Sequence, residues 1–509
     1  MFRAVRHETS RELLLLLERS RRIFAASAIS LLILCAVDGA SGGPPALASS
    51  ISPDGDARDG ARAEAAGRSW LSRAFGDDGR LSGVGADAVS WEVECKELSP
   101  FCGRVVDTII VSGNTHTKSV TILRELATKQ GSILDESLIR RDIGRLRGLG
   151  YFSEVRVTAE DAPGGCRLIV AISERPGLFM RVPYPVVNYD FKDGVSYGLT
   201  WKVKNFRGNG EDISLTALAR RNQDQGGSLS WNIPWFTGRR MMLRFSVGGY
   251  RRLEEPEVDD FIKEQTMGGI AFGVPLTPSL VRQLWLIPSV SFERRYSRLT
   301  LPKRTQSPPG EFFRQDYVSF GADMTYDSRS DRLSPFDGML HRFRARRYTS
   351  VSGPEQTYVL YGSSNCFYLP VGASRSFIFA VESNVWEGDV PTFYELGMGG
   401  VHDLRGFSDC DLRGTAKVVG TVQYRQRLFG PVVFRIPRIG NFDVAVNGIA
   451  FLDNGALARS IVDIPKSIFY STGGLGVEVI SPFRDVLRLE MASDGTGTPA
   501  FYVTAGSDF

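Results

Sequence analysis

Short segments in which apolar and polar residues alternate fill the last two thirds of the chain. A period of two places the apolar side chains on one face of a β-strand and the polar ones on the other. The segments are 195–203, 211–219, 241–249, 268–274, 317–326, 340–348, 376–383, 418–429, 442–453, 473–480, 486–491 and 500–506. Because they are frequent and their loops are uneven in length, they predict a mainly β domain over 178–509, folded as a closed antiparallel sheet.

The hydrophobic pattern excludes a bundle of membrane helices. A helix that crosses a membrane needs about 20 apolar residues in a row, and the chain has no such run after residue 50. A transmembrane β-barrel escapes this search, because its strands alternate lipid-facing and lumen-facing residues. The 54 glycines and 31 phenylalanines suit a barrel rich in turns and interfacial aromatics, but they would also suit a soluble β-sandwich.

The last segment of the chain favours the membrane barrel. A period of two places Phe501 and Phe509 on the same face of this segment. Bacterial outer-membrane barrels typically finish on an aromatic residue, and aromatic girdles mark both membrane interfaces. We therefore interpret Phe501 and Phe509 as the signal of a closing barrel strand.

The N-terminal region has the pattern of a secretory signal. Several arginines precede the apolar stretch 23–37, and an Ala-Leu-Ala site ends at Ala48. This order predicts a signal peptide over 1–48, cleaved after Ala48. The alternative is a single membrane anchor, for which about 15 apolar residues would be short. Residues 49–90 are rich in Gly, Ala, Asp and Arg, and predict a flexible linker.

A small α/β module is predicted over 91–177. The expected elements are a strand over 105–111, a helix over 117–129, a second helix ending at Gly150, and strands over 152–159 and 167–173. Apolar residues with helical spacing support both helices, and Asp135 is the expected N-cap of the second. The predicted order is therefore β-α-α-β-β.

This order and three motifs resemble the polypeptide-transport-associated (POTRA) domain. The motifs are 109–114 (IIVSGN), 149–152 (LGYF) and 170–176 (VAISERP). The resemblance implies a periplasmic domain with an exposed sheet edge, to which an unfolded client chain could add a strand. The sequence contains one copy of this module.

The motif with the strongest functional signal lies late in the β-rich region. Its residues are Gly399, Gly400, Leu404, Arg405, Gly406 and Phe407, within the stretch GGVHDLRGF. They resemble the Gly-Gly…(Val/Leu)-Arg-Gly-(Phe/Tyr) signature of the BamA-type outer-membrane assembly-factor superfamily, also called the bacterial surface antigen family. In that family the signature loop folds back into the barrel lumen, and an acidic residue in a Phe-x-Asp-x-Gly pattern holds its arginine.

The partner pattern occurs here as Phe451, Asp453 and Gly455, so the resemblance pairs Arg405 with Asp453. The pairing is chemically reasonable, because a charge inside a lumen needs a partner and the planar guanidinium matches a carboxylate. Gly406 would let the backbone turn tightly beside the pair. Phe407 would wedge the loop tip against the wall. The resemblance also implies about sixteen strands.

Two further motifs extend the resemblance to about residues 103–509. The stretch 326–338 resembles the family's Asp-(Thr/Ser)-Arg…Pro…Gly hairpin, and 205–210 (NFRGNG) resembles an early turn. The chain departs from the family in two respects. It has one POTRA-like module, where assembly factors usually have several. It also has Gln423 where many members have a glutamate.

Composition and motifs argue against an enzyme. The chain has four histidines and lacks Gly-x-Ser-x-Gly, His-Glu-x-x-His and P-loop motifs, so neither a metal site nor a cofactor site is predicted. A net charge of +4 without a basic stripe gives no support for nucleic-acid binding. Among the six cysteines, Cys95 and Cys102 could close a short disulfide loop in an oxidising compartment.

The sequence therefore suggests an outer-membrane protein assembly factor, with its POTRA domain in the periplasm. Unfolded outer-membrane client polypeptides would be received by the POTRA domain and inserted into the lipid bilayer through the barrel seam. The first strand is expected near 196–203 and the last near 500–509. Accessory periplasmic proteins are possible partners. The alternatives are a polypeptide secretion pore of the two-partner type and a passive porin or surface antigen.

Overall fold

The computed structural model describes residues 86–87, 98–177, 181, 183–190, 194–220, 224–254, 259–302, 312–332, 334–391, 394–401, 403–407, 412–436, 440–480, 486–495 and 499–505. The expected signal peptide, Cys95 and Phe509 lie outside the described residues. Cys102 forms no disulfide within them. None of the helices in the described part of the chain could span a membrane.

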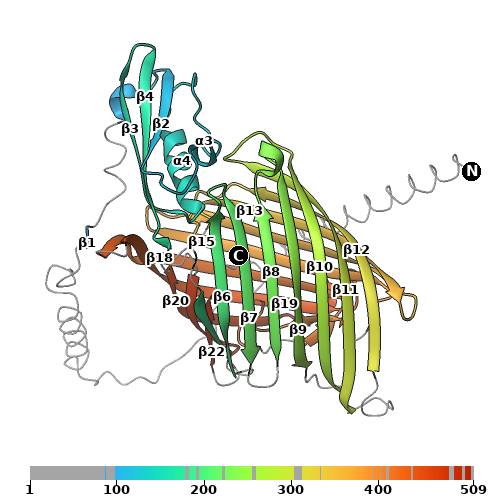
Figure 1. The fold of residues 1–509 in the computed structure, drawn as a ribbon. Coiled ribbons are helices and arrows are strands. Elements are labelled where there is room, and N and C mark those ends of the chain that lie inside the picture. Colours follow the sequence, from blue (N-terminus) through green and yellow to red (C-terminus); the bar gives the residue numbers. More distant parts are fainter. Residues whose placement is uncertain are drawn as a thin grey trace, which may run out of the picture. The chain divides into compact units, whose positions relative to one another are not determined.

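The small domain has the predicted order β-α-α-β-β (Figure 1). Its elements are η1 (Ser99–Phe101), β2 (Val106–Ser112), α3 (Ser119–Leu123), α4 (Glu136–Gly148), β3 (Phe152–Ala162) and β4 (Gly165–Glu174). The sheet order is β2-β4-β3, in which β2 runs parallel and β3 antiparallel to the central strand β4. Both helices pack one apolar face on this sheet, around Ile122, Leu146 and Val170.

The two helices differ in how well the sequence predicted them. For α4 the expected cap is confirmed, because the Asp135 carboxylate accepts a hydrogen bond from the Ser137 N–H at 2.8 Å. The helix expected over 117–129 is wrong in length, since α3 ends at Leu123. The Asp142 carboxylate binds the N–H groups of Ala127 and Thr128, at 2.7 and 2.9 Å. These bonds replace the ones that a longer helix would have made.

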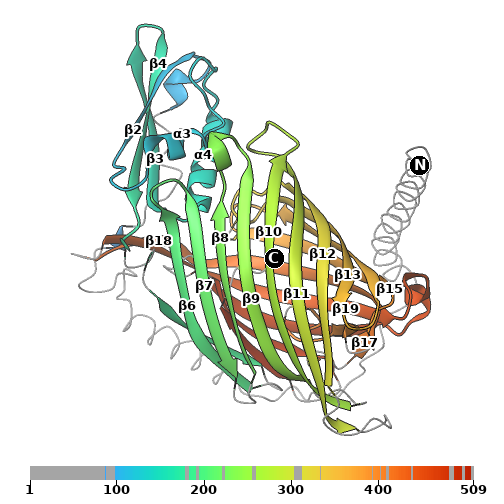
Figure 2. The same ribbon diagram turned by 45° about the vertical axis from the view of Figure 1, so that its right-hand side comes forward.

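In the part of the chain that the structure describes, sixteen antiparallel strands form a closed barrel, which confirms the predicted fold class (Figures 1 and 2). The strands are β5 (Tyr184–Asp190), β6 (Gly194–Phe206), β7 (Glu211–Arg220), β8 (Gln225–Ile233), β9 (Met242–Glu254), β10 (Asp259–Pro275), β11 (Gln283–Pro302), β12 (Phe312–Asp327), β13 (Gly338–Ser352), β14 (Thr357–Pro370), β15 (Arg375–Gly388), β18 (Ala416–Ile436), β19 (Gly440–Ala458), β20 (Tyr470–Ile480), β21 (Val486–Ser493) and β22 (Ala500–Ala505). Each strand pairs with the next along the chain, and β22 pairs with β5 to close the sheet. The two-residue strand β1 (Ala86–Asp87) precedes both domains.

The first barrel strand is β5, which corrects the expectation that it lies near 196–203; that stretch belongs to β6. β5 was not predicted because it contains Pro185. Proline lacks the N–H that a strand ladder uses, so it argues against a strand in the sequence. Pro288 similarly lies inside β11. Two more strands were missed because polar and small residues interrupt their alternation, namely β8 and β14.

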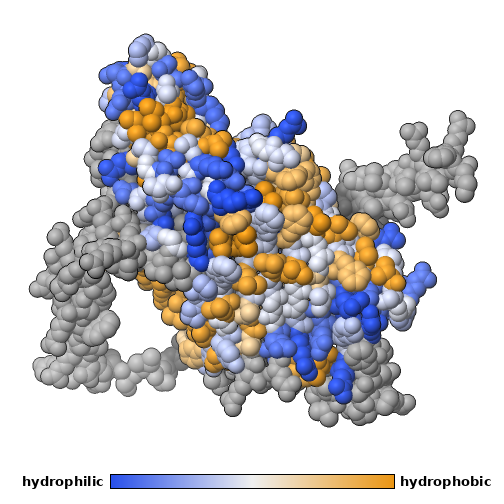
Figure 3. Space-filling model, viewed as in Figure 1, coloured by the Kyte–Doolittle hydropathy of each residue, from blue (hydrophilic) through white to orange (hydrophobic). Residues whose placement is uncertain are grey.

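The outer face of the barrel is apolar. Side chains on this face, such as Tyr197, Phe320 and Leu452, are 58–66% exposed. Figure 3 shows apolar residues exposed on the barrel wall. The lumen, in contrast, holds buried charged residues, among them Arg295 and Arg405. This apolar-out, polar-in arrangement is that of a transmembrane barrel.

Candidate functional site

The candidate site is the loop between β15 and β18, which leaves the barrel at the end opposite the small domain. Two short strands, β16 (Leu396–Met398) and β17 (Leu412–Gly414), pair within the loop, and β17 lies against β19 (Figure 2). The tip between them is buried: Met398 and Leu404 are inaccessible and pack on Val419. The signature loop is therefore folded into the lumen.

Glycines shape the tip of this loop. The N–H of Gly400 donates to the carbonyl of Phe407 at 2.7 Å, which closes the tip into a compact turn. Gly399, Gly400 and Gly406 have φ values of 135°, 86° and 103°, a region that other residues rarely adopt. The glycines of the signature thus allow the backbone to present Arg405 toward the wall.

The structure brings Arg405 and Asp453 together. The guanidinium donates from Nε and a terminal nitrogen to the two Asp453 oxygens, both at 2.7 Å, in a bidentate pair. The Arg405 side chain is 4% exposed and that of Asp453 is inaccessible. Thr421 donates to the same carboxylate at 2.8 Å. Phe451 lies under the guanidinium, with its ring centroid 3.3 Å from the central carbon.

A second carboxylate, which sequence reasoning missed, completes the arginine site. Glu490 on β21 accepts a hydrogen bond from Arg405 at 2.8 Å, and its side chain is 1% exposed. The sequence could have indicated Glu490, because it is a charged residue between Leu489 and Met491. Both neighbours face outward, so Glu490 must face the lumen. Gln423 is fully buried on β18, and its amide makes no hydrogen bond within the described residues. In this chain the second acid comes from β21 instead.

The remaining signature residues pack the tip against neighbouring strands. Phe407 meets the Tyr470 ring edge-on at 5.4 Å between centroids. A side chain at Gly455 would place its Cβ 2.9 Å from the Met398 sulfur. Position 455 of the wall must therefore lack a side chain for Met398 of the loop to pack against it. Phe501 is 53% exposed on the outer face and takes no part in the site.

The tip also contacts the closing strand of the barrel. The Gly406 N–H donates to the Tyr502 hydroxyl at 2.9 Å. Tyr502 is buried on β22, in register with Glu490 on one side and with Asp190 of β5 on the other. In the described residues, β22 and β5 pair at only two positions, the second being Val503 with Tyr189. The loop therefore touches β22, which pairs with β5 at two positions among the described residues.

The hairpin motif at 326–338 contacts the opposite wall near the other end of the lumen. Arg425 on β18 donates to the carbonyl of Pro335 at 2.9 Å, and Arg425 pairs with Glu478 at 3.2 Å. Ser334 lies within hydrogen-bonding distance of the same glutamate at 3.3 Å. The turn between β12 and β13 is thus held against the β18–β20 wall. The lumen is occupied near both ends in this conformation.

Two motifs that the sequence showed separately form one contact between the domains. Tyr151 of the LGYF turn donates its hydroxyl toward the carbonyl of Gly210 and the carboxylate of Asp212, both at 3.1 Å. From the barrel side, Asn205 donates its amide to the Thr117 hydroxyl at 2.8 Å. The NFRGNG turn is therefore a docking turn for the small domain.

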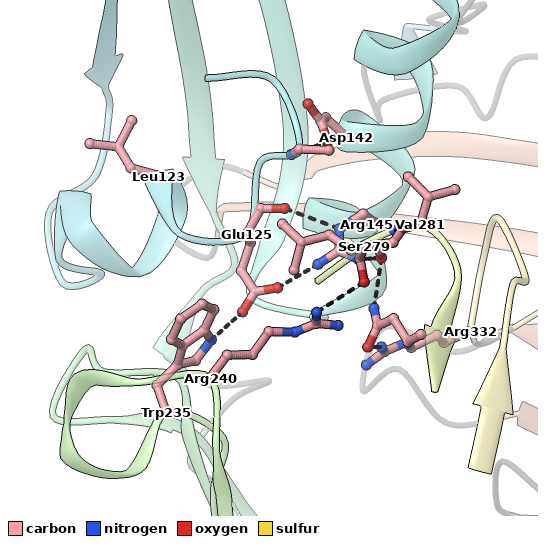
Figure 4. Close-up of polar contacts among 12 residues, drawn as sticks. Leu123, Glu125, Asp142, Arg145, Trp235, Arg240, Ser279, Val281 and Arg332 are labelled. Carbon is pink, nitrogen blue, oxygen red and sulfur yellow. Dashed lines mark hydrogen bonds and ion pairs between the residues drawn. The ribbon is translucent and has the colours of Figure 1, made fainter. Parts of the chain in front are cut away.

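A charged cluster extends this contact across other barrel turns (Figure 4). Glu125 accepts from Arg145 at 2.8 Å and from the Trp235 indole at 2.7 Å. Arg145 of α4 also donates to the Leu280 carbonyl, and Arg240 donates to the Ser279 carbonyl at 2.9 Å. Burial lowers the pKa of the Arg145 guanidinium, although nearby Glu125 opposes this shift. The small domain is thus fixed to three turns of the barrel.

Comparison with protein families identifies the architecture. The Omp85 superfamily domain matches residues 205–509, which is more than half of the chain. The chain belongs to the Omp85 superfamily. The surface antigen variable number repeat, a POTRA family, matches residues 105–175. This Omp85 protein is therefore an outer-membrane β-barrel with a POTRA domain, as the motifs predicted.

Individual relatives agree with this assignment. The Omp85 protein is 22% identical over 329 residues to outer membrane protein assembly factor BamA of Neisseria meningitidis, covering 59% of this chain and 39% of the relative. It is 28% identical over 144 residues to a putative outer membrane protein assembly factor of Treponema pallidum, covering 28% and 17%. The matched segments thus span less than half of these relatives. Among solved structures, CdiB from Escherichia coli has the same fold, with a TM-score of 0.52, 12% identity, and coverage of 91% and 93%.

Proposed function

We propose that this protein inserts client polypeptides into the outer membrane through the junction between β5 and β22. The observation that carries the proposal is the pairing of these strands at only two positions in the described residues, beside a loop tip that bonds to Tyr502. Within the described residues the other neighbouring barrel strands pair over more positions, for example six between β21 and β22. A client strand that pairs with an opened edge would satisfy backbone groups that hydrocarbon leaves unsatisfied.

In this proposal the POTRA domain delivers the client from the periplasm. Its sheet has β2 at one edge and β3 at the other, and an extended chain can add to such an edge by backbone hydrogen bonds. Ile110 on β2 is 42% exposed and would give a client side chain an apolar contact. The driving force is the client's own folding and the burial of its apolar surface in lipid.

A seam-locking disulfide tests the proposal. The register pair Tyr189 and Val503 would be replaced by cysteines in an otherwise cysteine-free chain, because paired antiparallel residues have Cα separations that a disulfide can bridge. The matched control places cysteines at the β14–β15 register pair Ser363 and Ser383. Both proteins are put into liposomes, and folding of an urea-unfolded barrel client is followed by its heat-modifiable gel shift.

We expect the seam lock to abolish accelerated client insertion, and reduction of the disulfide to restore it. The control disulfide should leave insertion unchanged. Acceleration that survives the seam lock would refute insertion through the junction. The alternative, a secretion pore, predicts passage of a client through the lumen in spite of the lock. Occupation of the lumen by the signature loop and the 328–337 turn favours the junction over this alternative.

A further inference from the structure

A second group of buried side chains holds the lumenal loop at its stem. Tyr394 lies in the segment that leads from β15 into β16. The central guanidinium carbon of Arg295, on β11, is 4.5 Å from the centroid of the Tyr394 ring. The ammonium nitrogen of Lys263, on β10, is 5.4 Å from the same centroid. Two cations of the wall therefore contact one aromatic ring of the loop.

Arg295 is held by an aromatic cage of the wall. Its guanidinium carbon lies 4.9, 5.1 and 5.9 Å from the ring centroids of Tyr317, Tyr348 and Tyr358, and the side chain is 5% exposed. Tyr348 and Tyr358 stack at 4.9 Å, and Arg295 donates to the Tyr358 hydroxyl. A guanidinium removed from water and facing several rings binds them more strongly than an exposed one does.

The orientation of Arg295 is fixed independently of the loop. Glu293 accepts from two of its nitrogens, at 2.6 and 3.1 Å, and is itself 3% exposed. Gln265 donates to the same carboxylate at 3.0 Å and accepts from Tyr250 at 2.9 Å. This chain of hydrogen bonds runs across β9, β10 and β11. The wall thus presents a preformed cationic surface to the ring of Tyr394.

The two contacts of the loop lie on different sectors of the barrel. The tip is bound at Asp453, Glu490 and Tyr502, on β19, β21 and β22. The stem is bound by residues on β10 to β14, and Val390 packs on the same aromatic cluster. We propose that Arg295 is a positioning residue: with its tyrosine cage it grips Tyr394, so that the loop crosses the lumen as a strap attached at both ends.

This inference rests on the proposed function only for its consequence, which is that the strap keeps the loop tip at Tyr502 beside the junction. The attachment itself can be measured without a client. Arg413 lies next to the stem, where it donates to the Glu395 carbonyl at 3.5 Å. Release of Tyr394 should expose the peptide bond after Arg413 to trypsin. Detergent-folded full-length protein would be digested, and the new N-terminus at Gly414 identified by mass spectrometry.

We expect Arg295→Ala to raise the initial rate of cleavage after Arg413 by about fivefold or more, from the loss of the desolvated cation–π contacts. Arg295→Lys should restore much of the protection, because it keeps a cation against the rings. Arg344→Ala is the matched control, since Arg344 is on the same wall and pairs with Asp323 at 3.2 Å. It should cleave at the wild-type rate.

Variants on the loop keep the test decisive if Arg295→Ala fails to fold, as judged by heat-modifiable gel mobility. Tyr394→Ala removes the ring from the loop side and should give the same increase in cleavage. Tyr394→Phe keeps the ring and should behave as wild type. Wild-type protection in both Arg295→Ala and Tyr394→Ala would overturn the second attachment, whatever the result of the seam-lock experiment. An equal increase in Arg344→Ala would also overturn it.

Discussion

Removing one charged partner at a time from the arginine site should give a graded loss of stability. The site holds one cation and two carboxylates, and all three side chains are at most 4% exposed. Arg405→Ala leaves both acids buried without their cation. Breaking a buried ion pair in this way typically costs about 3–5 kcal/mol. This variant should therefore be the least stable of the set.

The two acids should differ, because their hydrogen bonds differ. Asp453 accepts two bonds from Arg405, whereas Glu490 accepts one. Asp453→Asn keeps the shape but loses half of a bidentate charged pair, at a cost of about 2–3 kcal/mol. Glu490→Gln keeps an oxygen that can accept the 2.8 Å bond, and it also relieves the excess negative charge. Its cost should be about 1 kcal/mol or less.

Stability can be measured as the urea midpoint of unfolding in lipid vesicles, followed by tryptophan fluorescence and gel mobility. Trypsin cleavage after Arg413 reports separately on the loop. We expect the destabilisation to rank Arg405→Ala, then Asp453→Asn, then Glu490→Gln. If Glu490→Gln costs as much as Asp453→Asn, bidentate pairing does not determine the strength of the site. If all three variants match wild type, the buried site does not stabilise the fold.

Three further predictions concern the β5–β22 junction, the contact between the two domains, and a carboxylate of the small domain. Tyr502→Phe removes the bond from Gly406, so hydrogen exchange of β22 amides should rise several-fold, while Tyr470→Phe on β20 should leave it unchanged; equal exchange in both would contradict the loop–seam contact. Tyr151→Phe loses the hydroxyl donor shared by the Gly210 carbonyl and the Asp212 carboxylate, and should speed exchange over 205–210, corresponding to about 1–2 kcal/mol; unchanged exchange would show that the contact is dispensable. Burial alone would raise the pKa of Glu174, but hydrogen bonds from Thr115, His116 and Thr117 lower it to about 2. Because the folded pKa lies below the unfolded value of about 4.3, this stabilisation is full above that value and disappears as the pH falls toward 2. After allowance for exposure it should amount to about 1 kcal/mol. It should be seen as an acid-induced loss of exchange protection at 115–117, relative to the intrinsic exchange rate, in wild type and as pH-independent protection in Glu174→Gln; identical pH profiles of protection would contradict it.

The sequence predicted those features that depend on local periodicity. Alternation revealed most barrel strands, and the N-cap role of Asp135 followed from residue type and position. Strands with an internal proline, such as β5, were missed. Proline has no backbone N–H for the strand ladder, so its presence argued against a strand in those segments. The first helix was predicted too long, because nothing local reveals that Asp142 captures the N–H groups of Ala127 and Thr128.

The candidate site was only partly accessible to the same reasoning. Motifs pointed to Arg405 and Asp453 because both lie in short recognisable patterns. Glu490 and Tyr502 stand in strands without such a pattern. Glu490 meets Arg405, and Tyr502 meets the Gly406 N–H, only once the barrel strands are in register. The aromatic cage of Arg295, on β11, is likewise assembled from three further strands, β12, β13 and β14. Contacts of this kind depend on register across distant strands, which alternation alone does not fix.

Client insertion by the seam-locked protein, with cysteines at positions 189 and 503, is the decisive test of the proposed route. If clients enter at this junction, the oxidised protein will be no faster than empty liposomes, reduction will restore insertion, and the control disulfide at positions 363 and 383 will have no effect. Full insertion activity in the oxidised, seam-locked protein would contradict the claim that clients enter the membrane between β5 and β22.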